Sequence, residues 1–130
     1  MLGRVGVLIS VAMFAVGAWA IKPMPPVEVA IQADDGALTA AGSGTVTFSV
    51  IPEVDVEQAY VEFAVVTGDV VITGPTSATL GRLASGQTYT SATTVQVTGQ
   101  GASEVRGTVH GLDAAGTELF WRSEAVLLGV

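Results

Sequence analysis

The chain has 130 residues, which is enough for one small domain and a terminal segment. It contains no cysteine, so the sequence excludes disulfide bonds, thiolate nucleophiles, iron–sulfur clusters and cysteine-ligated zinc. Beyond Pro26 the chain carries three basic and twelve acidic residues, a net charge of −9. Such a surface repels nucleic-acid phosphates and anionic lipid headgroups, so we expect no nucleic-acid partner.

The N-terminus is apolar and predicts a membrane helix. Residues 5–21 carry no charge and lie between Arg4 and Lys22. At ~1.5 Å per residue this stretch would form a helix about 25 Å long, within the range of short membrane spans. We expect residues 1–22 to form a hydrophobic helix that anchors the protein in a membrane. The anchoring side chains would be Val5, Leu8, Ile9, Phe14 and Trp19.

The same stretch also fits a signal peptide. Arg4 would be its basic region, and Ala18-Trp19-Ala20 would be the small-residue site, with cleavage after Ala20. In both cases Arg4 stays in the cytoplasm and the rest of the chain is exported to the periplasmic or extracellular side. Residues 23–26 hold three prolines and predict a short, stiff spacer between the N-terminal segment and a domain at residues 27–130.

From Val27 onward, apolar residues recur at every second position, which is typical of β-strands. The inward sets include Val46, Phe48 and Val50, then Val61, Phe63 and Val65, then Thr93, Val95 and Val97, and finally Val105 and Val109. Glycine, proline and aspartate turns separate the runs, and residues 113–116 predict a type I turn closed by a left-handed Gly116. The spacing predicts an all-β domain: an antiparallel two-sheet sandwich of seven or eight strands.

The last strand, over residues 118–128, contains Phe120 and Trp121 side by side. Neighbouring residues of a strand face opposite ways, and Trp121 shares its side with Leu119 and Ala125. We expect Trp121 to enter the core and Phe120 to stay outside. With Val126 and Leu128, Phe120 would then form an exposed strip that contacts a partner protein.

Three segments together resemble bacterial immunoglobulin-like accessory domains. They are "GTVTFSVIPEVDVEQAYVEFAVV", "LGRLASGQTYTSATTVQVTG" and "EVRGTVHGLDAAGTELFWRSEAVLL", and the second contains a Leu-x-x-Gly-Gln turn at residues 83–87. The resemblance covers nearly all of residues 27–130. It implies an immunoglobulin-like sandwich that serves as a spacer, adhesive module or assembly subunit. The Cys…Trp…Cys signature of antibody domains is absent, because the chain has no cysteine.

Few residues of the sequence could take part in catalysis or metal binding. His110 is the only histidine, and it shares a strand side with Arg106 and Thr108, where we expect it to be exposed. No serine lies in a recognisable nucleophile motif, so we expect no enzymatic activity and no cofactor. Glu53, Asp55 and Glu57 alternate in an extended segment and are the only candidate metal ligands, for calcium. The Asp-x-Asp-x-Asp-Gly pattern of calcium loops is absent, so we expect a solvated acidic edge there and no bound metal.

These features predict a non-enzymatic, membrane-tethered β-sandwich that acts as an accessory or structural subunit of a membrane-associated assembly. Its partners would be other protein subunits, chiefly membrane proteins. One alternative is a secreted module, cleaved after Ala20, that binds a protein or a glycan. Another is a filament subunit with an apolar N-terminal helix, although residues 5–21 lack the early glutamate that is typical of pilins.

Overall fold

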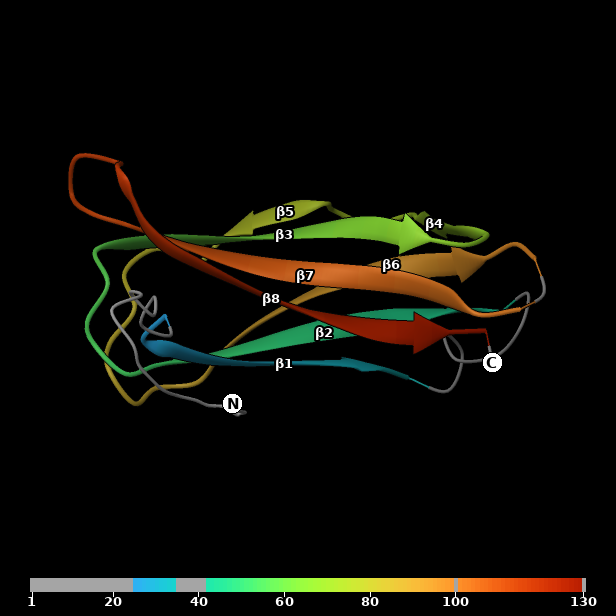
Figure 1. The fold of residues 1–130 in the computed structure, drawn as a ribbon, viewed down its shortest axis with the longest axis horizontal. Coiled ribbons are helices and arrows are strands. Elements are labelled where there is room, and N and C mark those ends of the chain that lie inside the picture. The colour runs from blue at the N-terminus through green and yellow to red at the C-terminus, as the bar shows by residue number, and fades with distance from the viewer. Residues whose placement is uncertain (1–24, 35–41, 100, 130) are drawn as a thin grey trace, which may run out of the picture.

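The computed structural model describes residues 25–34, 42–99 and 101–129, and it places them in two layers of antiparallel strands (Figure 1). The first sheet contains, in spatial order, β1 (Val27–Ala33), β2 (Ser43–Pro52), β6 (Tyr89–Val97) and β4 (Val70–Ile72). The second sheet contains β5 (Ser77–Thr79), β3 (Gln58–Thr67), β7 (Ser103–Leu112) and β8 (Glu118–Leu128). For these residues, the prediction of an all-β domain with two antiparallel sheets is confirmed.

The predicted N-terminal helix, residues 1–22, lies outside the described residues, and so do Pro23 and Met24. Within residues 25–34, 42–99 and 101–129 there is no helix that could cross a membrane. Pro25 and Pro26 join the domain directly: the Val27 amide donates to the Pro25 carbonyl and the Glu53 amide to the Pro26 carbonyl, each at 2.8 Å. The entry of the chain into the first sheet is therefore fixed by hydrogen bonds.

The core lies between the two sheets and is built mostly of valine. Its members come from both layers, and its largest fully buried side chains are Phe48, Leu83 and Leu128. The Phe48 ring of the first sheet meets the Phe63 ring of the second edge to face, with centroids 6.5 Å apart. Burying a valine or phenylalanine side chain stabilises a fold by about 1.5–3 kcal/mol, so this layer is the main source of stability.

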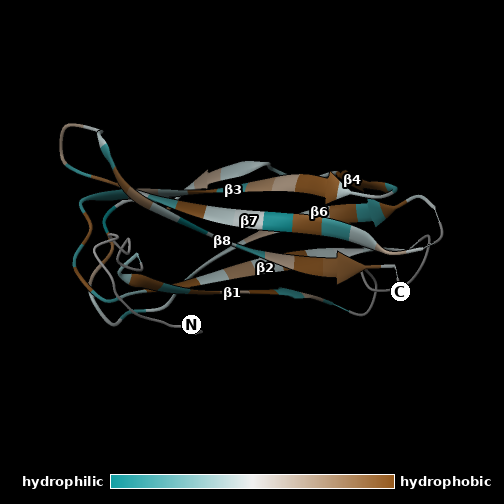
Figure 2. Cartoon of the chain, in the orientation of Figure 1, coloured by the Kyte–Doolittle hydropathy of each residue, from teal (hydrophilic) through white to brown (hydrophobic). Residues whose placement is uncertain are grey.

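The alternation predicted from the sequence is confirmed for most strands, and bands of apolar and polar colour alternate along them in Figure 2. The predicted inward residues of β2, β6 and β7 are buried. Val65 is an exception, since it is exposed. The pairing of β3 with β7 shifts between Val65 and Thr67, and this bulge lies where the strand leaves the core. The predicted turn at residues 113–116 is present: the Gly116 amide donates to the Asp113 carbonyl, and Gly116 has a φ of 87°.

The prediction for β8 is wrong: its two sides are exchanged. Trp121 is 57% exposed, whereas Leu128 is fully buried, and Phe120 and Val126 pack partly buried against the core. Phe120 faces inward because its partner on β7 is Gly111, and the Phe120 ring fills the space that a side chain at Gly111 would need. The strip of Phe120, Val126 and Leu128 therefore belongs to the interior and cannot be the predicted contact surface.

The prediction for β8 failed because charged residues lie on the inner side of this strand. β8 is an edge strand, and it lies beside β1, the edge strand of the other sheet (Figure 1). There the Arg122 Nη1 donates a hydrogen bond of 2.7 Å to the Val27 carbonyl, so its charged end is satisfied between the two edges. Inward charges of this kind also discourage another strand from pairing with a free edge.

The exchange of sides in β8 predicts opposite effects for two substitutions. Leu128→Ala should lower the free energy of unfolding by about 2–5 kcal/mol, because it leaves a cavity in the core. Trp121→Ser should change it by less than about 1 kcal/mol, because the indole is mostly exposed. Urea unfolding of both full-length variants, followed by circular dichroism, measures the two values. A larger loss for Trp121→Ser than for Leu128→Ala would restore the original assignment.

Candidate contact site on the outer face of the second sheet

Three neighbouring strands place an aromatic row on the outer face of the second sheet. The register pairs Tyr60 of β3 with His110 of β7, and His110 with Trp121 of β8. Directly paired residues of antiparallel strands point to the same side, so the three rings follow one another across the sheet. The Tyr60 and His110 rings are stacked, with centroids 4.5 Å apart and planes 8° from parallel.

His110 is held by two carboxylates. Its Nε2 lies 2.9 Å from Glu62 Oε1 and its Nδ1 lies 2.9 Å from Glu118 Oε1. Ionised carboxylates only accept hydrogen bonds, so the doubly protonated ring is the form that can donate to both at once. The prediction that His110 is exposed is wrong: the side chain lies on the outer face of the sheet but is only 15% exposed, because Tyr60 and the two glutamates surround it.

A bulge brings Glu118 to this face. Gly111 pairs with Phe120 but Leu112 pairs with Glu118, so Leu119 is the extra residue of β8. In a regular strand Glu118 and Trp121 would face opposite ways, whereas the extra residue puts both on the outer side. The turn that precedes the bulge is rigid: Asp113 Oδ1 accepts hydrogen bonds of 2.9 Å from the amides of Ala115 and Thr117. The position of Glu118 beside His110 is thus set by the backbone.

The environment of Tyr60 shows the electrostatic character of this site. Partial burial of the phenol raises the pKa of Tyr60 above its ordinary value, and the nearby carboxylates of Glu62 and Glu118 raise it further. Both carboxylates are themselves partly exposed to solvent. The cluster therefore presents negative charge next to aromatic rings.

Large apolar side chains extend this site along β8. Leu119, Trp121 and Leu127 are 61%, 57% and 55% exposed, and we call them the β8 strip. Trp121 and Leu127 lie on the outer face, about 20 Å apart at ~3.3 Å per residue. From the alternation in the sequence, this side of β8 was expected to face the core. Its only sequence signal is that the odd positions of the strand carry apolar residues, with Ser123 as the exception.

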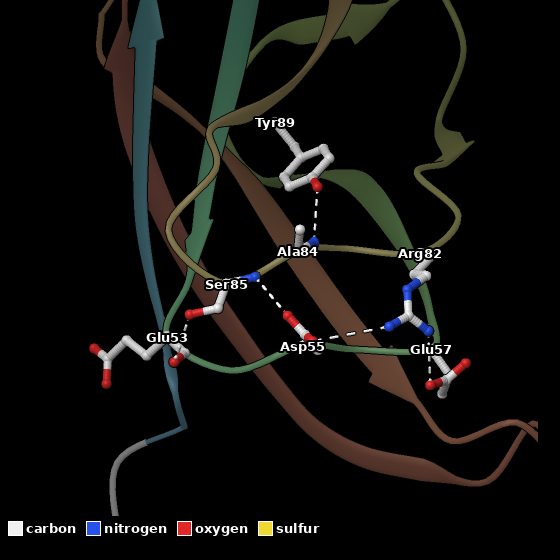
Figure 3. Close-up of polar contacts among 7 residues, drawn as sticks. All are labelled: Glu53, Asp55, Glu57, Arg82, Ala84, Ser85 and Tyr89. Atoms are coloured by element: carbon white, nitrogen blue, oxygen red, sulfur yellow. Dashed lines mark hydrogen bonds and ion pairs between the residues drawn. The ribbon is translucent and has the colours of Figure 1, made fainter.

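The acidic residues Glu53, Asp55 and Glu57 hold a loop in place (Figure 3). Arg82 lies between Asp55 and Glu57, with Nη1 2.9 Å from Glu57 Oε2 and Nη2 3.8 Å from Asp55 Oδ2. Asp55 also accepts a 2.9 Å hydrogen bond from the Ser85 amide, and the Ser85 hydroxyl donates to the Glu53 carbonyl. The Glu53 carboxylate points away from the other two.

This arrangement does not suit calcium. The guanidinium of Arg82 pairs with two of the three carboxylates and offsets one of their two negative charges, and its positive charge repels a divalent cation. In the part of the chain that the structure describes, no group of three or more histidine, aspartate or glutamate side chains is arranged to hold a metal ion. The acidic segment instead ties the loop around Ser85 to the connection between β2 and β3.

Comparisons with known proteins inform the fold. No model of a known protein family matches the chain, and no curated protein matches it. Among solved structures, the chain is similar to the crystal structure of a FixG-related protein from Vibrio parahaemolyticus. The TM-score is 0.50 at 13% sequence identity, and the match covers 81% of this chain and 96% of that one. At this identity the likeness shows a shared fold alone.

The charges around Tyr60 lead to a titration test. Glu62→Gln and Glu118→Gln should each lower the pKa of Tyr60, since each removes a negative charge that disfavours the phenolate. The pKa should stay above the ordinary value, because burial is the larger cause of the shift and remains. The Cζ chemical shift of Tyr60, followed by NMR against pH, measures this. Glu124→Gln on β8 is the matched control, and an equal change in that variant would contradict the assignment.

Proposed function

We propose that this protein is a non-enzymatic accessory subunit of a membrane-associated assembly, which contacts its partner through the β8 strip. Residues 1–22 tether it to the membrane as a single helix, and the sandwich lies on the periplasmic or extracellular side. The proline-rich residues 23–26 hold the domain at a short distance from the bilayer. The other protein subunits of the assembly are its partners.

The strand order supports the immunoglobulin-like class within this proposal. If β1, β2, β6 and β4 correspond to strands A, B, E and D, the first sheet has the order of an immunoglobulin constant-type domain. Strands β3, β7 and β8 then correspond to C, F and G, and β5 is an additional short strand beside C. Domains of this architecture serve chiefly as binding and structural modules, which fits an accessory role.

The observation that carries the proposal is the exposure of the β8 strip. Three large apolar side chains of one long edge strand are exposed to solvent. One of them is Trp121, and tryptophan is among the residue types that contribute most to binding energy at interfaces. Burying one such side chain contributes roughly 1.5–3 kcal/mol. The net charge of −9 beyond Pro26 opposes contact between two copies of the domain, so the strip suits a different protein.

Site-specific photocrosslinking in the native membrane tests this proposal. A photoreactive phenylalanine analogue at position 121 should crosslink to one defined protein of the assembly. The same analogue at position 71 is the matched control, because Val71 is 52% exposed on the edge strand β4 of the other sheet. Equal yields at the two positions, or products that contain only this chain, would count against a contact through β8.

The N-terminal mass of the same purified protein tests the tether. We expect a mass that begins at Met1 or Leu2. A mass that begins at Ile21 would show cleavage after Ala20 and would favour the secreted module instead.

A further inference from the structure

We propose that the β8 strip and the carboxylates beside it bind an arginine side chain in an extended segment of the partner protein. This inference rests on the proposed function and specifies the chemistry of the partner. It follows from an exposed indole that lies next to partly exposed negative charge. The charge of the domain decides between the possible occupants of the face.

The geometry next to Trp121 suits a planar cation. Trp121 pairs with His110, and His110 engages the Oε1 atoms of Glu62 and Glu118, so the two carboxylates are fixed within reach of the row of rings. Two carboxylates outnumber one imidazole, so this group of three keeps a net negative charge in either protonation state of His110. A guanidinium can lie flat on an exposed indole while its N–H groups reach a carboxylate at the ring edge. The compact, strongly hydrated ammonium of lysine fits such a surface less well.

Little positive charge lies on this face, because two of the three arginines of the domain are engaged elsewhere. Arg82 is engaged by Asp55 and Glu57 in a loop, and Arg122 is turned toward the Val27 carbonyl. Among the described residues, Arg106 is the one arginine on the outer face of the second sheet, opposite Ala125. Glu104 lies opposite Leu127, so both ends of the face combine an apolar side chain with a carboxylate.

The same charges argue against the other occupants. A second copy of the domain brings the same excess of carboxylates, and an anionic lipid surface or a nucleic acid is repelled. A basic segment is attracted over the whole surface and then finds an aromatic anchor at Trp121. Charge complementarity thus selects an arginine-bearing protein segment.

The test uses the full-length protein in nonionic detergent and a fluorescently labelled peptide whose binding is followed by anisotropy. The peptide is a short extended sequence with two arginines spaced by apolar residues. Two matched peptides carry lysine or the neutral analogue citrulline at those positions. We expect saturable binding of the arginine peptide, about two- to fivefold weaker binding of the lysine peptide and no measurable binding of the citrulline peptide. Binding should weaken as salt is raised.

Variants of the protein locate the site. Trp121→Ala should weaken binding of the arginine peptide by about fivefold or more, and Glu118→Gln by about two- to fivefold. Val71→Ala and Glu28→Gln on the first sheet are the controls and should leave the affinity unchanged. Each variant is first checked for an unaltered thermal unfolding midpoint. A variant that fails this check is replaced by Trp121→Phe or Glu62→Gln.

Each other outcome overturns the inference. Equal binding of the citrulline peptide, lost in Trp121→Ala, would show an apolar contact without arginine recognition, and the proposed function would survive. No saturable binding up to millimolar peptide, or binding that is unaffected at Trp121 and Glu118, would remove the arginine site. Binding of a neutral oligosaccharide that is lost in Trp121→Ala, without peptide binding, would assign the face to a glycan. Concentration-dependent self-association lost in Trp121→Ala would assign it to a second copy.

Discussion

The inner side of β7 carries two glycines on which the packing of the second sheet depends. Gly107 faces Phe48 across the core, and a Cβ at Gly107 would lie 2.6 Å from the Cδ1 of that ring. Gly111 receives the ring of Phe120 from the neighbouring strand in the same way. Because real Cβ contacts are never so short, no larger residue fits at either position without a shift of the rings. The two phenylalanines therefore take the volume that β7 leaves empty.

The side chains of β8 follow from this constraint. Once Phe120 is directed onto Gly111, the alternation of the strand sends Val126 and Leu128 inward, and Trp121 and Leu127 outward. It also turns Arg122 toward the gap between β1 and β8, where the Val27 carbonyl accepts its hydrogen bond. Inward packing, protection of the free edge and exposure of Trp121 are thus consequences of one steric arrangement. The exposed apolar side chains of β8 are therefore a consequence of how the core is filled.

The sequence predicts the parts of this fold in which burial follows a strict alternation. β2, β6 and β7 have apolar or small residues at every inward position and are covered by strands on both sides, so their patterns are reliable. β8 has only one neighbour in its sheet, and its inner side is open enough to hold Arg122. Charge then no longer marks the solvent side, and the pattern of an edge strand becomes ambiguous.

The candidate site was beyond sequence reasoning for a different reason. Glu62 and His110 are 48 residues apart, and their contact depends on the register of β3 against β7. Glu118 reaches the same histidine only because Leu119 is an extra residue in β8, and no local sequence pattern predicts this bulge. For the same reason, the acidic segment around Asp55 looked like a cation site until Arg82 was placed beside it.

The distribution of charge connects the fold with the proposed function. The structure directs two of the three arginines beyond Pro26 to internal partners, Arg82 to carboxylates and Arg122 to a backbone carbonyl. Their positive charge is therefore unavailable to balance the outer face of the second sheet. His110 lies between Glu62 and Glu118 and can offset at most one of their two negative charges. A partner that supplies a cation would balance the negative charge of this face. The desolvation cost would be low, because the side chains of Glu62 and Glu118 are already about half shielded from solvent.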